Sequence, residues 1–132
     1  MAATPTALDK ADRVGFAASF LCALHCALMP LAAALLPALG LGVGGWVDFD
    51  QAFVVFATLL GATTLALGWR LHRAFRAWAF LLPGLALVWA GAFSPLHTHG
   101  WGHAVVMVGG GVLLAVAHLV NLRLTHAARL AG

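Results

Sequence analysis

The chain has 132 residues, of which 63% are hydrophobic and only 8% are charged. A soluble globular domain is roughly half apolar and about a quarter charged, so this composition excludes a soluble domain and favours an integral membrane protein. The formal net charge of +3 would fit a nucleic-acid-binding protein, but the positions of the basic residues indicate another role for it.

Four apolar segments follow one another along the chain, at about residues 14–41, 51–69, 77–93 and 103–122. Each is close to the ~20 residues that a helix needs to cross the hydrocarbon core at ~1.5 Å per residue. We therefore predict an all-α fold in which residues 1–132 form a single four-helix transmembrane domain.

The basic residues indicate how this bundle is oriented. In a four-helix topology all seven fall on one side: Lys10, Arg13, Arg70, Arg73, Arg76, Arg123 and Arg129. The positive-inside rule then predicts that both termini are cytoplasmic. The basic charge is a topology signal, and we expect no nucleic-acid partner.

The first apolar segment contains FLCALHCALMP at residues 20–30. On a helix, Cys22, His25 and Cys26 stand at i, i+3 and i+4 and share one face. Counting from Arg13, this patch lies ~14–20 Å into the membrane, which is close to the midplane. Two thiols and an imidazole at that depth require an explanation.

Three interpretations compete for this patch. Free cysteines behave as small apolar residues, and His25 could simply hydrogen-bond a neighbouring helix, although histidines within the membrane are usually functional. A redox dithiol is the second interpretation, but Cβ atoms at i and i+4 lie ~5–6 Å apart and a disulfide needs ~3.5–4.5 Å, so the helix would have to distort.

A metal ion bridging the two sulfurs fits the spacing better, because two bonds of ~2.3 Å hold the sulfurs apart. Thiolates and an imidazole favour Zn²⁺, Cu⁺ and other soft or borderline ions over Mg²⁺ or Ca²⁺. A divalent ion with two thiolates and a neutral imidazole is uncharged, which lowers the cost of placing it in a membrane. Binding should release protons and weaken as the pH falls.

Further candidate ligands stand on the fourth segment. His118 and Asn121 are at i and i+3, in the cytoplasmic half, with His126 beyond them. We expect His118 to be the fourth ligand or the next station inward, with hydrogen-bonded packing as the alternative. On the opposite side of the membrane the titratable residues are Asp48, Asp50, His97, His99 and His103, which would suit first capture of a cation or simply form a solvated surface.

Two stretches resemble a known family. DKADRVGFAASFLCALHCALMPLAAALLPALG and AHLVNLRLTH are similar to the N-terminal DK…G…S…LC..HC…P…LP pattern and the C-terminal H..N.R pattern of the MerC family of small inner-membrane proteins associated with mercuric-ion transport. The resemblance implies four transmembrane helices in a bacterial inner membrane and ion binding by the first-helix cysteine pair, here Cys22 and Cys26. It implies a transport protein and no enzyme.

The chain departs from the family pattern in two ways. The mercury-resistance members carry CxxC in the first helix where this chain has CALHC, and they carry a further cysteine pair near the C-terminus, where Thr125 and His126 stand here. Gaining a histidine and losing cysteines shifts the ion preference of the site from Hg²⁺ toward Zn²⁺. We keep both ions as candidate cargo, with Cu⁺ possible.

The sequence thus predicts a protein of the lipid bilayer that binds a heavy-metal ion at Cys22, His25, Cys26 and His118 and passes it inward, with no ATP-binding motif to drive it. A cytoplasmic metal acceptor and a homo-oligomer, formed through small-residue helix faces, are the expected partners. Alternatives are a thiol-redox protein, a haem protein using His25 and His118, or an accessory subunit of a larger transporter.

Overall fold

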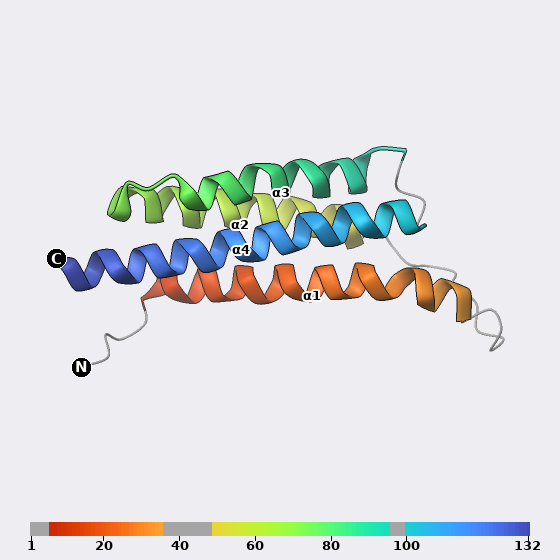
Figure 1. Cartoon of the computed structure of the whole chain (residues 1–132), viewed down its shortest axis with the longest axis horizontal. Coiled ribbons are helices and arrows are strands. Elements are labelled where there is room, and N and C mark those ends of the chain that lie inside the picture. The colour runs from red at the N-terminus through yellow and green to blue at the C-terminus, as the bar shows by residue number, and fades with distance from the viewer. Residues whose placement is uncertain (1–5, 36–48, 96–99) are drawn as a thin grey trace.

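The computed structural model describes residues 6–35, 49–95 and 100–132. These form α1 (Ala7–Leu35), α2 (Phe49–His72), α3 (Arg76–Phe93) and α4 (Trp101–Ala131). The helices run side by side along their lengths, and the start of α1 and the end of α4 lie at the same end of the bundle (Figure 1). The described residues contain no strand, so the prediction of an all-α fold is confirmed.

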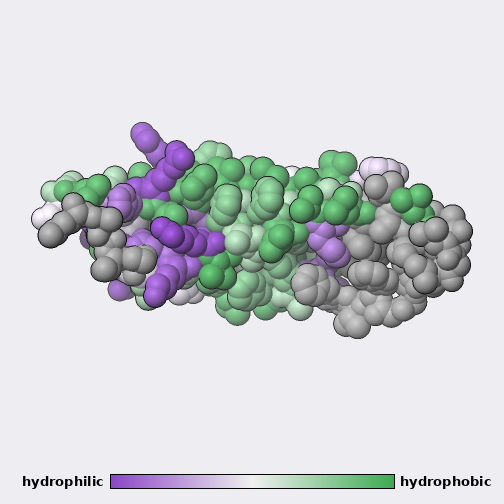
Figure 2. Space-filling view, turned by 90° about the horizontal axis from the view of Figure 1, so that it is seen from below, coloured by the Kyte–Doolittle hydropathy of each residue, from purple (hydrophilic) through white to green (hydrophobic). Residues whose placement is uncertain are grey.

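All four helices are long and apolar enough to cross a membrane. Only 33% to 44% of each apolar window is buried inside the bundle, so most of it faces outward. Large apolar side chains are exposed on every helix, and they form a broad hydrophobic surface over the middle of the molecule (Figure 2). Lipid is the solvent that such a surface requires, and the chain is therefore a multi-pass membrane protein.

α4 is the central helix of the bundle. It packs against the other three, whereas α1 and α3 lie on opposite sides of it and their described residues do not pack together (Figure 1). Adjacent glycines allow this close packing: a Cβ at Gly111 would lie 3.0 Å from the Cβ of Ala23, and one at Gly110 would lie 2.6 Å from Cγ1 of Val88. These small residues of α4 thus let it approach α1 and α3 closely within the chain.

Two helices extend further than the apolar segments predicted. α1 begins at Ala7, not near residue 14, because Thr6 and Asp9 form a capping box in which each side chain accepts a hydrogen bond from the other's backbone N–H. α4 continues to Ala131, where Arg129 Nη1 lies 2.6 Å from Asp9 Oδ2. At 31 residues α4 is about 46 Å long, so it extends beyond a hydrocarbon core of ~30 Å.

The charged flanks are therefore helical and belong to the bundle. All seven basic side chains stand at the end that carries the first turn of α1 and the last turns of α2 and α4, which we call the basic end. That this end faces the cytoplasm remains a prediction from the positive-inside rule.

Candidate metal centre

One face of α1 carries small and polar residues toward the interior of the bundle. Asp12, Gly15, Ser19, Cys22 and Cys26 follow one another at steps of three and four, and all are buried. The exposed positions between them are mostly large and apolar. This distribution suits a membrane helix whose polar groups line an interior and whose apolar groups meet lipid.

The two thiols lie together on this face. Cys22 and Cys26 are 4% and 2% exposed, both are free of a disulfide, and their Sγ atoms are 4.0 Å apart. That is about twice the length of an S–S bond, ~2.05 Å. If both sulfurs bound one ion at ~2.3 Å, a 4.0 Å separation corresponds to an S–metal–S angle of about 120°. The pair is spaced for a shared ion.

A carboxylate from another helix lies beside Cys26 and His25. Ligand atoms of His25, Cys26 and Asp50 all lie within 4.8 Å of one another. Ligand atoms around a tetrahedral ion with bonds of 2.0–2.3 Å are about 3.3–3.8 Å apart, so a pair at the 4.8 Å limit would have to approach by about 1.0–1.5 Å. Asp50 is the second residue of α2 and is buried. The sequence placed it only among the groups for first capture, whereas the structure brings it beside Cys26 and His25.

His103 holds Asp50 from a third helix. Its Nε2 lies 3.0 Å from Asp50 Oδ2 and its Nδ1 lies 3.2 Å from the carbonyl oxygen of Gly91. Because a carbonyl only accepts, Nδ1 of His103 is the donor in the contact with Gly91. His103 and Asp50 are both buried. We call Cys22, His25, Cys26, Asp50 and His103 the thiol cluster.

Two residues of the thiol cluster show at which end of the bundle it lies. Asp50 and His103 stand in the first turns of α2 and α4. These turns lie at the end of the bundle opposite the basic end (Figure 1). The cluster is therefore near that end of the membrane-spanning region, where an ion arriving from outside the bundle has a short way to travel.

A second buried polar cluster lies toward the basic end. His118 Nδ1 is 2.9 Å from Asp12 Oδ1, and Asn121 Nδ2 donates to Asp12 Oδ2 at 2.7 Å. His118 is 2% exposed and Asp12 is fully buried. The His118 ring lies against Gly15, two helical turns before Cys22, so the structure pairs His118 with Asp12 and not with the thiols.

Asn121 connects this cluster to α2. The backbone N–H of Ala74 donates to His72 Nδ1, so the hydrogen of His72 is on Nε2, which donates to Asn121 Oδ1 at 3.0 Å. The amide nitrogen of Asn121 also donates to the carbonyl oxygen of Thr64 at 3.2 Å. Each polar atom of the Asn121 side chain therefore has a partner. We call Asp12, His72, His118 and Asn121 the carboxylate network.

The remaining predicted residues are placed as follows. His126 is exposed near the end of α4. Asp48, His97 and His99 lie outside the described residues. Sequence reasoning missed Asp12, because the predicted first segment began at about residue 14, and it assigned no role to His72. The signal for Asp12 was its register, because it lies ten residues before Cys22 on the same helical face.

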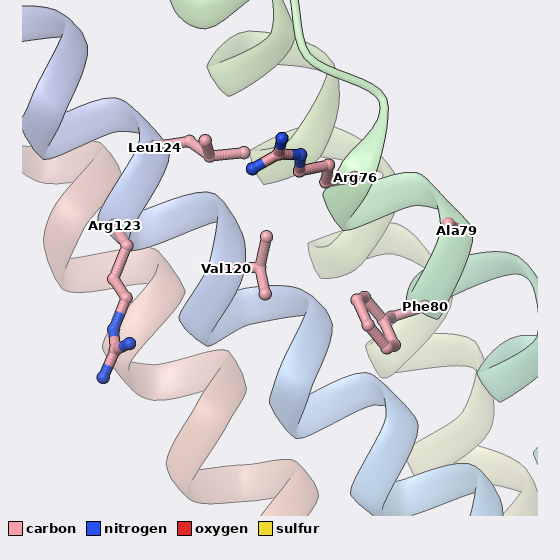
Figure 3. Close-up of a pocket in the computed structure, with 6 residues that line it drawn as sticks. All are labelled: Arg76, Ala79, Phe80, Val120, Arg123 and Leu124. Carbon is pink, nitrogen blue, oxygen red and sulfur yellow. The ribbon is translucent and has the colours of Figure 1, made fainter.

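A pocket of about 490 Å³ opens between α3 and α4 near the basic end (Figure 3). Its lining is almost entirely apolar, and the guanidinium groups at its rim point in different directions (Figure 3). The residues around it are Arg76, Ala79, Phe80, Val120, Arg123 and Leu124. None of these is a metal ligand, so this pocket does not contribute to the candidate metal centre.

Fold and site together define a small multi-pass membrane protein with a buried thiol–imidazole–carboxylate cluster. Residues 12–123 match the family described as MerC mercury resistance protein, and the chain belongs to that family. Membership makes it a heavy-metal resistance or transport protein of a membrane. No curated protein and no solved structure matches the chain.

Proposed function

We propose that the protein carries a heavy-metal ion inward across the bacterial inner membrane and that Cys22, His25 and Cys26 bind the ion on the way. The observation that carries the proposal is the pair of buried thiols 4.0 Å apart, beside an imidazole, in a chain of the mercury resistance family. Hg²⁺ is the cargo that the family favours, and the added imidazole extends the range toward Zn²⁺.

The placement of the thiol cluster supports a direction for this transport. The cluster lies at the end opposite the basic end, and the positive-inside rule assigns the basic end to the cytoplasm. An ion from the periplasm would then meet the thiols first. Release would follow by thiol exchange with a cytoplasmic metal acceptor, since the sequence contains no ATP-binding motif. A homo-oligomer is a further proposed partner.

Transport into vesicles tests the proposal. Purified, reduced protein is reconstituted into liposomes that contain an entrapped metal-sensitive dye, and entry of Hg²⁺ is followed for the wild type and for the Cys22→Ser/Cys26→Ser variant. We expect the double variant to fall to the rate of protein-free vesicles, because serine hydroxyls do not replace thiolates for a soft ion.

Ser19→Ala is the matched control for this experiment. It removes a polar atom from the same buried face of α1, one turn from Cys22, without removing a sulfur. It should transport like the wild type. Equal transport by the double serine variant and the wild type would contradict the proposed function.

A further inference from the structure

We propose that Asp50 is the fourth ligand of the thiol cluster and that His103 is the positioning residue that holds it there. The inference rests on the proposed function, which places an ion at Cys22, His25 and Cys26. It adds a ligand from a second helix and predicts which ions the site prefers. Neither the family match nor the helix periodicity of α1 assigns a role to Asp50.

The position of Asp50 supports this role. Its carboxylate is buried at 7% exposure in the first turn of α2, within 4.8 Å of ligand atoms of His25 and Cys26. A carboxylate in an apolar membrane protein is costly unless it binds a partner. His103 already engages Oδ2 of Asp50 at 3.0 Å, and a bound ion would be a second partner that connects α1 to α2.

His103 fixes the direction in which Asp50 points. Its Nε2 engages Oδ2 of Asp50, while its Nδ1–H donates to the Gly91 carbonyl of α3. Ligating carboxylates are commonly hydrogen-bonded by a further group that orients them. Here that group is buried at 4% exposure and is held on α4, so Asp50 is oriented before the ion arrives.

The expected ion preference follows from geometry. Two sulfurs on a linear two-coordinate ion would be about 4.6 Å apart with bonds of ~2.3 Å, whereas tetrahedral coordination needs about 3.8 Å. The Sγ atoms are 4.0 Å apart, which is nearer the tetrahedral value. Two thiolates, an imidazole and a carboxylate therefore favour four-coordinate borderline ions such as Zn²⁺ and Co²⁺, in addition to Hg²⁺.

Co²⁺ titration of the purified, reduced protein tests the inference, because the d–d bands of Co²⁺ report tetrahedral coordination. Asp50→Asn should weaken the tetrahedral bands and raise the dissociation constant for Co²⁺ by about 100-fold, the upper end of the range for groups around a metal site. His103→Ala should raise it by about 10-fold. Binding of Hg²⁺, which depends on the sulfurs, should remain stoichiometric in both variants.

Asp12→Asn is the matched control, because Asp12 is also a buried aspartate bound to a histidine but lies in the carboxylate network. It should leave the Co²⁺ spectrum unchanged. Asp50→Cys provides a second test should Asp50→Asn fail to fold, since a third thiolate should add intensity to the sulfur-to-cobalt charge-transfer band.

The outcomes separate the inference from the proposed function. Wild-type Co²⁺ spectra and affinity in Asp50→Asn, or no added charge-transfer intensity in Asp50→Cys, would overturn the role of Asp50 while leaving the thiols as the carrier. Hg²⁺ binding that survives Cys22→Ser/Cys26→Ser would instead overturn the proposed function.

Discussion

The thiol cluster and the carboxylate network both bury an aspartate–histidine pair between helices, yet they differ in what remains available to a ligand. In the carboxylate network both oxygens of Asp12 accept hydrogen bonds, one from Asn121 and one in contact with His118. In the thiol cluster Asp50 is held through Oδ2 and lies beside a sulfur and an imidazole. In the carboxylate network both oxygens of Asp12 have partners within the chain, whereas the thiol cluster has the ligands for a cation.

Burial of a histidine in a membrane bundle therefore does not by itself identify a metal site. His118 and His103 are almost equally buried and each contacts an aspartate. What separates them is the set of neighbouring atoms. Sulfur stands beside Asp50, whereas an amide that is already fully hydrogen-bonded stands beside Asp12.

The largest expected effect on stability is in the carboxylate network. Asp12→Ala leaves one N–H of the Asn121 amide and the ring of His118 without the acceptor they share, while the amide keeps its bond to the Thr64 carbonyl. Unsatisfied buried groups cost about 1–3 kcal/mol each, although hydrogen bonds in membrane bundles are often worth less, so we expect a loss of about 2–4 kcal/mol. Reversible unfolding in mixed detergent micelles measures it.

The same variant tests whether the carboxylate network takes part in ion binding. Asp12→Ala should retain stoichiometric Hg²⁺ binding by the folded fraction, because the thiol cluster is two turns away along α1. An unchanged free energy of unfolding would contradict the stabilising role of the carboxylate network. A loss of Hg²⁺ binding in folded protein would contradict the assignment of ion binding to the thiol cluster alone.

The smallest expected effect is at the basic end. Arg129 contacts Asp9 at 2.6 Å, but its side chain is 25% exposed, so solvent screens the pair. Exposed ion pairs contribute about 0.2–1 kcal/mol, and Arg129→Ala should cost no more than that. The detergent unfolding experiment also measures this variant, and a loss as large as that of Asp12→Ala would contradict the ranking.

Much of the fold could be predicted from the sequence, because hydropathy alone defines four spans. The predicted bounds of the helices were too short where charged residues continue a helix beyond its apolar part. The first segment was predicted to begin near residue 14, although Thr6 and Asp9 carry the spacing of a capping box that starts α1 at Ala7. Arg129 likewise extends α4 beyond its apolar part.

The thiol face could be predicted for a similar reason, since helical periodicity brings Cys22, His25 and Cys26 together within one helix. The partners from other helices could not be predicted. Whether Asp50 or His118 reaches the thiols depends on the register of α1 against α2 and α4, which packing at positions such as Gly111 determines. Counting residues from the membrane edge gives the depth of a residue on its own helix, but it does not give the register of one helix against another.

X-ray absorption at the zinc edge determines whether Cys22 and Cys26 bind the metal ion. Purified, reduced protein is loaded with one equivalent of Zn²⁺, and the atoms around the metal are identified by type and distance. We predict two sulfur neighbours at about 2.3 Å and two nitrogen or oxygen neighbours at about 2.0–2.2 Å. A coordination shell of oxygen and nitrogen alone would place the ion away from Cys22 and Cys26 and would contradict the claim.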